Sequence, residues 1–484
     1  MDELVNKIKK LQGDSQSLDP DASTRGQLLG EVVKYTDRFL SEIDESPGYI
    51  AEDFSKNLEN YKVGEKGENL EKLLALFEEY VEKPGINPAS GGHLGYIPGG
   101  GLYTSAVGDF LAAVTNKYAG VYFGSPGAVR MEHMMVDWLI EILGFPKGAV
   151  GNLTSGGSIA TLTAVTVARD AHSISGAGVS KAVIYHTSQV HHCLHKAIRI
   201  AGLGDAIHRN IQTDSEYKMP LDQLEEFIAE DRKKGLNPFL VVSTAGTTDS
   251  GVVDPLAGIS DICKKYQLWH HVDAAYGGFF ILVEGLKDYF KGIAECDSIA
   301  IDPHKGLFLP YGTGAVIIKD VDALLKSHHY QANYMRDAYT GKSVLSPADI
   351  SPELTRHFRG LRMWLPLKLI GLDSFRKALE EKHLLALYFY EKIGEMGFET
   401  GGKPELSIVL YRYTQGIEPH RIDEFNTELI KACHRDGRVF LSSTTLKGRV
   451  WLRCAVLSFR THLSTIDKAL EMLSEALEEV KGLK

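Results

Sequence analysis

Two charged residues and a glycine-rich turn are the parts of this sequence that could do chemistry together. Asp273 directly follows the strand-like run LWHHV, and Lys305 lies in DPHKG, shortly after the apolar run SIAI. The turn Thr154–Ser158 stands immediately before a helical pattern. If the two runs are parallel strands, their carboxyl ends bring these groups to one edge of a sheet, where such folds bind ligands.

The three groups suit one cofactor, pyridoxal 5′-phosphate (PLP). A lysine amine can hold the PLP aldehyde as an imine, and a buried carboxylate favours a protonated pyridine nitrogen. Glycines at a helix start let backbone N–H groups approach a phosphate. The PLP ring accepts the electrons of a carbanion at an amino-acid Cα, which is otherwise too unstable to form. Lys305, Asp273 and the TSGGS turn therefore predict a PLP site.

Each feature has an ordinary explanation when it is taken alone. An aspartate after a strand is commonly a turn or cap residue, a lysine is commonly a solvated charge, and glycine-rich turns precede many helices. His191 and His195, four residues apart in HTSQVHHCLH, could also bind a metal. No carboxylate or second ligand pair accompanies them in the sequence, so no metal site is predicted.

Apolar runs alternate with helical patterns from about residue 103 to 320. This alternation predicts an α/β fold with a mostly parallel central sheet covered by helices on both faces. Helices are expected at Met134–Leu143 and Ile159–Ala171. Strands are expected at Ala182–Tyr185, Leu240–Ser243, Trp269–Val272, Ser298–Ile301 and Ala315–Ile318.

The two ends of the chain have different patterns from this central part. Near the N-terminus, apolar residues recur at helical spacing from Leu28 to Phe39, after a cap at Ser23 or Thr24. The C-terminal part predicts helices over Leu372–Met396 and Ile466–Val480 and strands near Ile408–Tyr413 and Val450–Val456. We therefore expect an N-terminal helical segment (1–85), a large PLP-binding α/β domain (86–355) and a small C-terminal α+β domain (356–484).

The composition restricts the partners and the compartment. A net charge of -10 and a pI of about 6.0 argue against nucleic acid or an anionic membrane as a partner. The five cysteines are scattered without a CxxC pair, which argues against a disulfide framework and a structural zinc site. The N-terminal residues lack the apolar core of a signal peptide, and no apolar run is long enough to span a bilayer. We expect a cytoplasmic protein that acts on a small molecule.

Seven ordered stretches make the chain resemble the group II PLP-dependent decarboxylases, the family of aromatic L-amino-acid, histidine and glutamate decarboxylases. That family lies within the fold-type-I, aminotransferase-like superfamily, and the resemblance covers roughly residues 85–370. The stretches are SPGAVRMEHMMVDWL, LTSGGSIATLTAVTVAR, TSQVHHCLHKA, STAGTTDSGVVDP, WHHVDAAYGG, DPHKG and RHFRGLRMW.

The resemblance implies a role for each residue of the site. Lys305 would carry the cofactor, Asp273 would pair with the pyridine nitrogen, and His191 and Ala275 would pack on opposite faces of the ring. Gly157 and Ser158 would contact the phosphate. The remaining cofactor residues would be Thr248, Asp302 and His304.

The resemblance also implies a tyrosine after the lysine that protonates Cα once CO2 has left. Counting without gaps gives Tyr334, while Tyr330 and Tyr339 in the same stretch are the alternatives. General acid catalysis needs one placed donor, which favours Tyr334. The polar stretch 328–347 is then expected to act as a lid that excludes water.

Several positions depart from the family pattern near the expected substrate pocket, which comprises Tyr96, Pro98, Gly99 and Gly120. Gly306 stands where many members have tryptophan, Gly99 where aromatic decarboxylases tend to have threonine, and Gly120 where they tend to have phenylalanine. The missing phenylalanine side chain is expected to open space or to admit a side chain from the partner subunit. The aromatic preference therefore cannot be carried over from the resemblance. Arg130 could pair with an acidic substrate, although an ion pair at a helix start is the ordinary explanation.

The resemblance therefore implies PLP-dependent decarboxylation of an L-amino acid to an amine and CO2, catalysed by a homodimer with shared active sites. The alternatives are a PLP-dependent aldehyde synthase or carbon–carbon lyase on the same scaffold, and a PLP-binding protein without activity. The intact set of lysine, aspartate and histidine argues against the last alternative.

Overall fold

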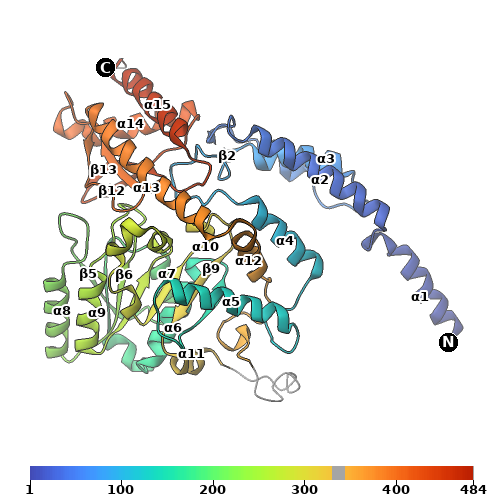
Figure 1. Ribbon diagram of the computed structural model, residues 1–484, viewed down its shortest axis with the longest axis horizontal. Helices are drawn as coiled ribbons and strands as arrows, with labels where there is room; N and C mark the ends of the chain where they lie inside the picture. The colour runs from blue at the N-terminus through green and yellow to red at the C-terminus, as the bar shows by residue number, and fades with distance from the viewer. Residues whose placement is uncertain (330–343, 483–484) are drawn as a thin grey trace.

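The computed structural model describes residues 1–329 and 344–482 and has a large sheet-centred unit beneath a smaller C-terminal unit (Figure 1). The large unit is built on a seven-stranded sheet with strand order β3-β9-β8-β7-β6-β4-β5. Only β9 runs antiparallel to its neighbours in this sheet. The strands are β3 (Val150–Thr154), β4 (Ala182–Thr187), β5 (Ile207–Ile211), β6 (Asn237–Thr244), β7 (Trp269–Asp273), β8 (Ser298–Ile301) and β9 (Gly314–Ile318).

Both faces of this sheet are covered because successive residues of a strand point to opposite sides. In β4, Ile184 packs with helices α6 and α7, while Val183 and Tyr185 pack with the cluster of helices α8 and α9 on the other side. Helix α5 covers the β3–β9 end of that second face. The bounds are α5 (Pro126–Ile142), α6 (Gly157–Ala171), α7 (Cys193–Ile200), α8 (Leu221–Lys233), α9 (Leu256–Tyr266) and α11 (Val321–His328).

The C-terminal unit is an antiparallel sheet of order β10-β11-β13-β12 packed against helices α13, α14 and α15. In β13, Leu452 and Cys454 face those helices, so the alternate residue Arg453 faces the large unit. The bounds are β10 (Glu399–Thr400), β11 (Ile408–Arg412), β12 (Ser442–Leu446), β13 (Arg449–Ala455), α12 (Gly360–Ile370), α13 (Leu372–Glu395), α14 (Ile422–Asp436) and α15 (Leu463–Gly482).

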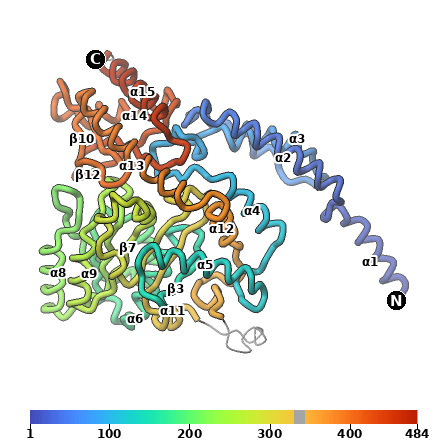
Figure 2. Tube along the Cα trace, in the orientation of Figure 1, coloured from blue at the N-terminus to red at the C-terminus, as the bar shows by residue number. Residues whose placement is uncertain are grey.

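The N-terminal helices extend away from the rest of the chain, with their inner end near the C-terminal unit (Figure 2). They are α1 (Asp2–Asp14), α2 (Ala22–Glu42) and α3 (Leu70–Phe77), and none of them has a buried residue in this chain. The cap of α2 is Asp21, whose side chain accepts a hydrogen bond from Thr24 N, and not Ser23 or Thr24 as expected. A short two-stranded sheet, β1 (Tyr49–Ile50) with β2 (Gly85–Ile86), and helix α4 (Tyr103–Thr115) complete this end of the chain.

A buried ion pair links two of the stretches that carry the family resemblance. Glu132 of α5 accepts a hydrogen bond from the guanidinium of Arg356 at 2.8 Å and further bonds from the N–H groups of Arg359 and Gly360. Both Glu132 and Arg356 are almost fully buried. The pair therefore fixes the start of α12 against the large sheet.

The predicted fold class is confirmed, and each predicted strand of the large sheet lies within an observed one. In the C-terminal unit, the two predicted strands extend one residue beyond β11 and β13, and β10 and β12 were not predicted. Within the large unit, three features differ from the expectation. Strand β3 and edge strand β5 were not predicted, and the connection from β7 to β8 consists of three short 3-10 helices, Gly278–Leu282, Glu284–Phe290 and Ile293–Glu295. Among the described residues, no helix combines the length and the apolar character needed to cross a membrane.

Candidate active site

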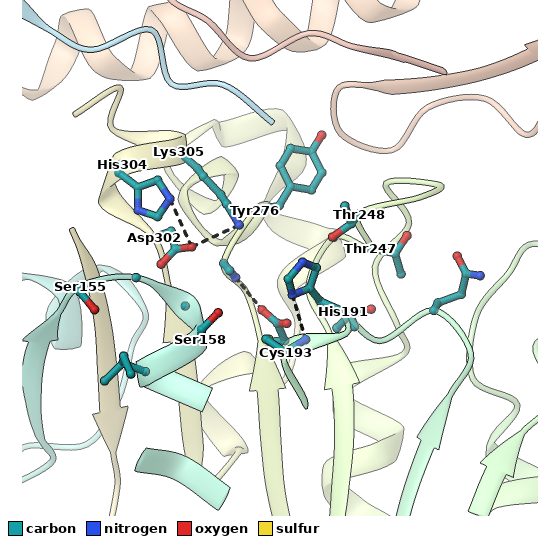
Figure 3. A pocket seen from close by; sticks show the side chains of 18 residues that line it. Ser155, Ser158, His191, Cys193, Thr247, Thr248, Tyr276, Asp302, His304 and Lys305 are labelled. Atoms are coloured by element: carbon teal, nitrogen blue, oxygen red, sulfur yellow. Dashed lines mark hydrogen bonds and ion pairs between the residues drawn. The ribbon is translucent and has the colours of Figure 1, made fainter. Parts of the chain in front are cut away.

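A cavity of about 240 Å³ opens at the carboxyl ends of the central parallel strands (Figure 3). Nine residues predicted from the sequence to bind a cofactor line it, although they come from five separate stretches of chain. They are Gly157, Ser158, His191, Thr248, Asp273, Ala275, Asp302, His304 and Lys305.

Lys305 reaches this cavity because β8 ends at Ile301 and one turn of helix, α10 (Pro303–Gly306), follows at once. Its Nζ lies 3.2 Å from Oδ2 of Asp302. Burial disfavours the ammonium form, but the carboxylates of Asp302 and Asp273 outweigh burial and raise the pKa of Lys305. The lysine is therefore held as a cation beside two carboxylates.

Asp273 is the last residue of β7, paired in register with Ala300 of β8. Its Oδ1 accepts a hydrogen bond from the N–H of Ala275 at 3.1 Å, which orients the carboxylate. Because β7 and β8 are adjacent parallel strands, Asp273 and Lys305 emerge side by side at the sheet edge.

The glycine-rich turn packs directly on Asp302. Gly156 has a φ of 153°, and α6 begins at Gly157. A Cβ on Gly157 would lie 3.0 Å from Oδ2 of Asp302 and 3.2 Å from the Cβ of Ala275, so a larger residue would fill this corner. The first N–H groups of a helix have no partner within the helix, which makes this corner suited to an anion.

His191 enters the cavity from the loop between β4 and α7. Its Nδ1 accepts a hydrogen bond from the N–H of Cys193 at 3.3 Å, so in the neutral ring the proton is on Nε2. Burial lowers the pKa of His191 below its ordinary value of 6.5. This imidazole is therefore a neutral group with one N–H to donate.

His304 lies beside the same carboxylate of Asp302. Its Nδ1 lies 2.7 Å from the carbonyl oxygen of Thr313, and its Nε2 lies 3.7 Å from Oδ2 of Asp302. Burial lowers the pKa of His304 as well. With Nδ1 donating to the Thr313 carbonyl, Nε2 of the neutral ring faces the carboxylate as an acceptor.

Several cavity residues were missed by the sequence reasoning. Gln189 and Thr247 adjoin predicted residues in the same motifs, and Ser250 Oγ links them, 2.7 Å from Thr247 Oγ1 and 3.5 Å from Gln189 Oε1. Cys193 also lines the cavity, and burial raises the pKa of its thiol to about 12, so the thiol is not an ionised nucleophile. The remaining missed residues are Ile159, Thr244, Gly246 and Tyr276, whereas Ser155 and Gly156 belong to the predicted glycine-rich turn.

Arg453 of the C-terminal unit joins that unit to the cavity wall. Its guanidinium donates to the carbonyl oxygens of Thr248, Asp249 and Gly95 and to Oγ of Ser442. The side chain is buried, and burial lowers the pKa of Arg453. No sequence pattern indicated this residue, because its partners lie on three distant segments.

The four expected substrate-pocket residues do not line the cavity within this chain. The side chain of Tyr96 is 56% exposed, and Pro98 is buried. A Cβ on Gly99 would lie 2.3 Å from the carbonyl oxygen of His304, and one on Gly120 would lie 2.0 Å from that of Leu354. Of the two alternatives expected at Gly120, open space is therefore wrong within this chain, since a backbone carbonyl occupies that space, and a side chain from the partner subunit stays a prediction.

The structure also describes Gly306 and Arg130, two other positions that the sequence singled out, but not the loop tyrosines. Gly306 has no room for a side chain, because a Cβ there would lie 2.6 Å from the Cβ of Phe279. Arg130 is exposed on α5, donates to the hydroxyl of Tyr122, and does not line the cavity. Tyr334, with its alternatives Tyr330 and Tyr339, lies outside the described residues.

The cavity residues fit PLP on structural grounds. Among the described residues, Oδ1 of Asp302 is buried without a hydrogen-bond partner, which leaves one strong acceptor for a bound group. The cavity also combines an amine, a carboxylate on the adjacent strand and a glycine-lined helix start. These groups match the aldehyde, the pyridine nitrogen and the phosphate of the cofactor.

Comparison with known proteins agrees with this chemistry. The family description "Pyridoxal-dependent decarboxylase conserved domain" matches residues 51–414. An aromatic-L-amino-acid decarboxylase of Bacillus atrophaeus is 31% identical and is aligned over 96% of this chain and 98% of its own. A phenylacetaldehyde synthase of Arabidopsis thaliana is 28% identical over 78% of this chain and 80% of its own. The crystal structure of Oryza sativa TDC with PLP and tryptamine superposes with a TM-score of 0.90 at 24% identity, covering 95% of this chain and 99% of the other.

Proposed function

Since this chain belongs to the family of pyridoxal-dependent decarboxylases, we propose that it converts a neutral, aromatic L-amino acid to the corresponding amine and CO2. Membership makes it a PLP-dependent carboxy-lyase that acts on an L-amino acid. The proposal therefore concerns the substrate class, the roles of individual residues and the assembly.

The observation that carries the substrate proposal is the charge of the cavity wall. An acidic substrate has a second carboxylate, which a buried site must pair with a cation. Within the described part of the chain, the cavity lining contains no arginine, and its lysine is the one expected to hold the cofactor. Arg130, the other candidate, donates to Tyr122 outside the cavity. The relative from Bacillus atrophaeus, an aromatic-L-amino-acid decarboxylase, supports the same class.

The test is a substrate screen of the holoenzyme. Release of CO2 and amine is measured with L-tyrosine, L-phenylalanine and L-tryptophan, and with L-glutamate, L-aspartate and L-cysteine sulfinate. We expect kcat/KM to be at least about 100-fold higher for one of the aromatic substrates, the size of effect that an unpaired buried charge produces. A preference for an acidic substrate contradicts the proposal, and no CO2 from any amino acid contradicts decarboxylation itself.

We propose the following division of roles among the residues of this chain. Bound PLP supplies an electron sink for the bond that breaks at Cα. Lys305 tethers the cofactor and is released when substrate binds, Asp273 keeps a proton on the pyridine nitrogen, and the N–H groups of Gly157 and Ser158 bind the phosphate. His191 covers the ring and presents its Nε2–H as a proton donor, and Tyr334 completes the proton transfer to Cα.

The remaining cofactor contacts belong to the same proposal. Ala275 packs against the ring face opposite His191, and Thr248 lies near Asp273. Asp302 and His304 orient Lys305. In the test, Lys305→Ala loses the visible absorbance of bound PLP together with turnover, whereas full turnover by this variant contradicts the assignment.

An aldehyde synthase is the second candidate, because a phenylacetaldehyde synthase is among the relatives. A simple decarboxylase forms amine and CO2 in equal amounts. An aldehyde synthase also releases CO2, but it consumes O2 and water and forms aldehyde, ammonia and hydrogen peroxide in place of the amine. Measuring all of these products in one incubation separates the two activities, and the neutral N–H donor of His191 favours the first.

We propose a homodimer whose N-terminal helices pack across the partner and complete the site. Helices α1, α2 and α3 bury no residue within one chain, yet they expose large apolar side chains, which soluble proteins rarely leave in contiguous patches. Tyr96, Pro98, Gly99 and Gly120 would then contribute to a substrate pocket at the subunit interface. The exposed side chains include Leu4, Ile8, Leu28, Leu29, Val32, Val33, Leu73 and Phe77.

Sedimentation of wild type and of Leu29→Glu with Val33→Glu tests the dimer. We expect the wild type to sediment as a dimer and the double variant to dissociate and lose activity. Glu31→Gln on the same helix is the matched control. A fully active monomer contradicts the proposal.

Two further expectations remain proposals. We place the protein in the cytoplasm, supported by five cysteines that are all buried as free thiols, as suits a reducing compartment. We keep the division into 1–85, 86–355 and 356–484, supported by a separate hydrophobic cluster around Phe389, Tyr411 and Leu473 in the last part. Limited proteolysis that cuts near the two boundaries supports the division.

A further inference from the structure

Three histidines that are distant in the sequence meet on one face of the large sheet, outside the cofactor cavity. They are His186 at the end of β4, His195 on α7 and His208 on β5. One ring nitrogen of each lies within 4.8 Å of one from each of the others. Their ring centroids are 5.3, 5.7 and 6.1 Å apart.

The fold brings them together through strand register and helix packing. In the parallel pair β4–β5, Ile184 is paired with His208, and His186 is two residues beyond Ile184 on the same face. That face is covered by α7, which turns Leu194, Ala197 and Ile198 inward. His195 lies at the exposed edge of this packing, over the two strand histidines.

The two ring nitrogens of His186 have the arrangement that is typical of a metal ligand. It is only 4% exposed, and its Nδ1 lies 3.0 Å from the carbonyl oxygen of Thr187. A proton on Nδ1, donated to that carbonyl, leaves Nε2 with a free lone pair. Nε2 is buried and has no hydrogen-bond partner among the described residues, which is unusual for a polar atom in a folded protein. Metal-binding histidines characteristically use one nitrogen for a backbone carbonyl and the other for the ion.

We propose that His186, His195 and His208 form a binding site for a divalent transition-metal ion of the zinc class. Neutral imidazole nitrogens suit zinc, copper and nickel, and three of them leave a further position for water. Ligand nitrogens around a tetrahedral zinc ion lie about 3.4 Å apart, given bonds of about 2.1 Å. Because His195 and His208 are exposed, rotation of their side chains closes the remaining gap around the buried Nε2.

Such an ion holds β4, β5 and α7 together on both sides of the loop that carries Gln189 and His191 into the cofactor cavity. His186 precedes that loop, and His195 lies four residues after His191, on α7. Metal binding to the folded protein stabilises it by mass action. The site therefore acts as a clamp behind the cavity wall, away from the reacting atoms.

The test uses PLP-loaded enzyme that has been treated with a chelator and dialysed. Zinc binding is measured by calorimetry, and Co²⁺ replaces zinc so that a visible absorption band reports tetrahedral nitrogen coordination. His195→Ala and His208→Ala remove exposed ligands, so both variants are expected to fold. His420→Ala, an exposed histidine on Pro419–Arg421, is the matched control.

We expect one ion per chain in the wild type and in His420→Ala. Removal of either ligand should weaken binding by about 100-fold and abolish the cobalt band. Zinc should raise the Tm of the wild type and leave that of the two ligand variants unchanged. These readouts do not depend on turnover.

His192→Ala distinguishes this site from one built on the neighbouring pair His191 and His192, whose rings are 4.0 Å apart. Binding that survives in His192→Ala supports the three-histidine site. Unchanged affinity in His208→Ala, or loss of binding in His192→Ala alone, overturns the proposal.

Discussion

Asp302 and Lys305 face each other across one helical turn, with the Oδ2 of Asp302 3.2 Å from the Nζ of Lys305. The same carboxylate contacts His304, and its other oxygen is buried without a partner among the described residues. Gly157 and Gly314 approach it so closely that a Cβ on either would lie 3.0 Å or less from one of its oxygens. The carboxylate therefore connects the lysine to the glycine-rich helix start.

This relationship predicts an effect of Asp302→Asn on cofactor capture. A neutral lysine amine is the form that attacks an aldehyde, and Asp302 is a main cause of the raised pKa of Lys305. Removing the charge lowers that pKa, so the pH midpoint for PLP capture by the apoenzyme shifts to lower pH. Borohydride trapping followed by mass spectrometry measures this, with the exposed Asp205→Asn as control. An unchanged midpoint contradicts the electrostatic role.

Gly99→Ala should displace the backbone that carries the lysine. The added Cβ would lie 2.3 Å from the carbonyl oxygen of His304 and 3.1 Å from that of Lys305. A displacement of about 1 Å at a reacting group typically lowers rate by about 100-fold, which is the expected loss in kcat. Steady-state kinetics and PLP affinity check this. Gly178→Ala, at an exposed glycine with no atom within 4 Å of the added Cβ, should match the wild type.

Loss of the Glu132–Arg356 ion pair should destabilise the fold. Glu132→Gln leaves the guanidinium of Arg356 buried without its charge partner, at a cost of about 3–5 kcal/mol in the free energy of unfolding. Denaturation by urea measures the change. Glu141→Gln, an exposed position on the same helix, should differ from wild type by less than about 0.5 kcal/mol.

The combined replacement Glu132→Met with Arg356→Met tests whether the unpaired charge of Arg356 causes this destabilisation. It removes both charges at once, so it should be less destabilising than Glu132→Gln alone. Equal losses in the two variants would show that packing, and not the unpaired charge, dominates.

His271 should make the protein sensitive to acid. This residue of β7 is fully buried, and burial lowers its pKa to about 4, below the ordinary value of 6.5. As the pH falls below 6.5, His271 becomes protonated in the unfolded chain but stays neutral in the folded chain until the pH approaches 4. The unfolded state is therefore favoured, and the stability present above pH 6.5 is progressively lost between pH 6.5 and pH 4. The full loss is roughly 3 kcal/mol from this group alone.

Urea denaturation between pH 7 and pH 4.5 in excess PLP measures this loss. His271→Asn, which cannot take up the proton, should lose less stability over this interval than the wild type. The exposed His420→Gln should follow the wild-type curve. Parallel curves for wild type and His271→Asn would contradict the assignment.

Much of the site could be predicted from the sequence, because its chemistry depends on local motifs. DPHKG puts a lysine one turn after a strand, DAAYGG puts a carboxylate at the end of another, and TSGGS begins a helix. Apolar runs of strand length separated by helical patterns then suffice to predict that these ends share one edge. The edge strand β5 was missed because its sequence, IHRNI, alternates exposed residues with half-buried or buried ones and does not form a continuous apolar run.

Only the tertiary structure decided which distant residues are neighbours. The spacing of His191 and His195 indicated a pair, but the fold turns His191 into the cavity and places His195 with His186 and His208. Likewise, open space was one of two expectations at Gly120, and in the structure the carbonyl of Leu354 occupies that space. The sequence by itself determined the residue types, their order and the strand ends on which they stand. Register between strands and the packing of helices act over long separations, so contacts such as Arg453 with Thr248 follow from the folded chain alone.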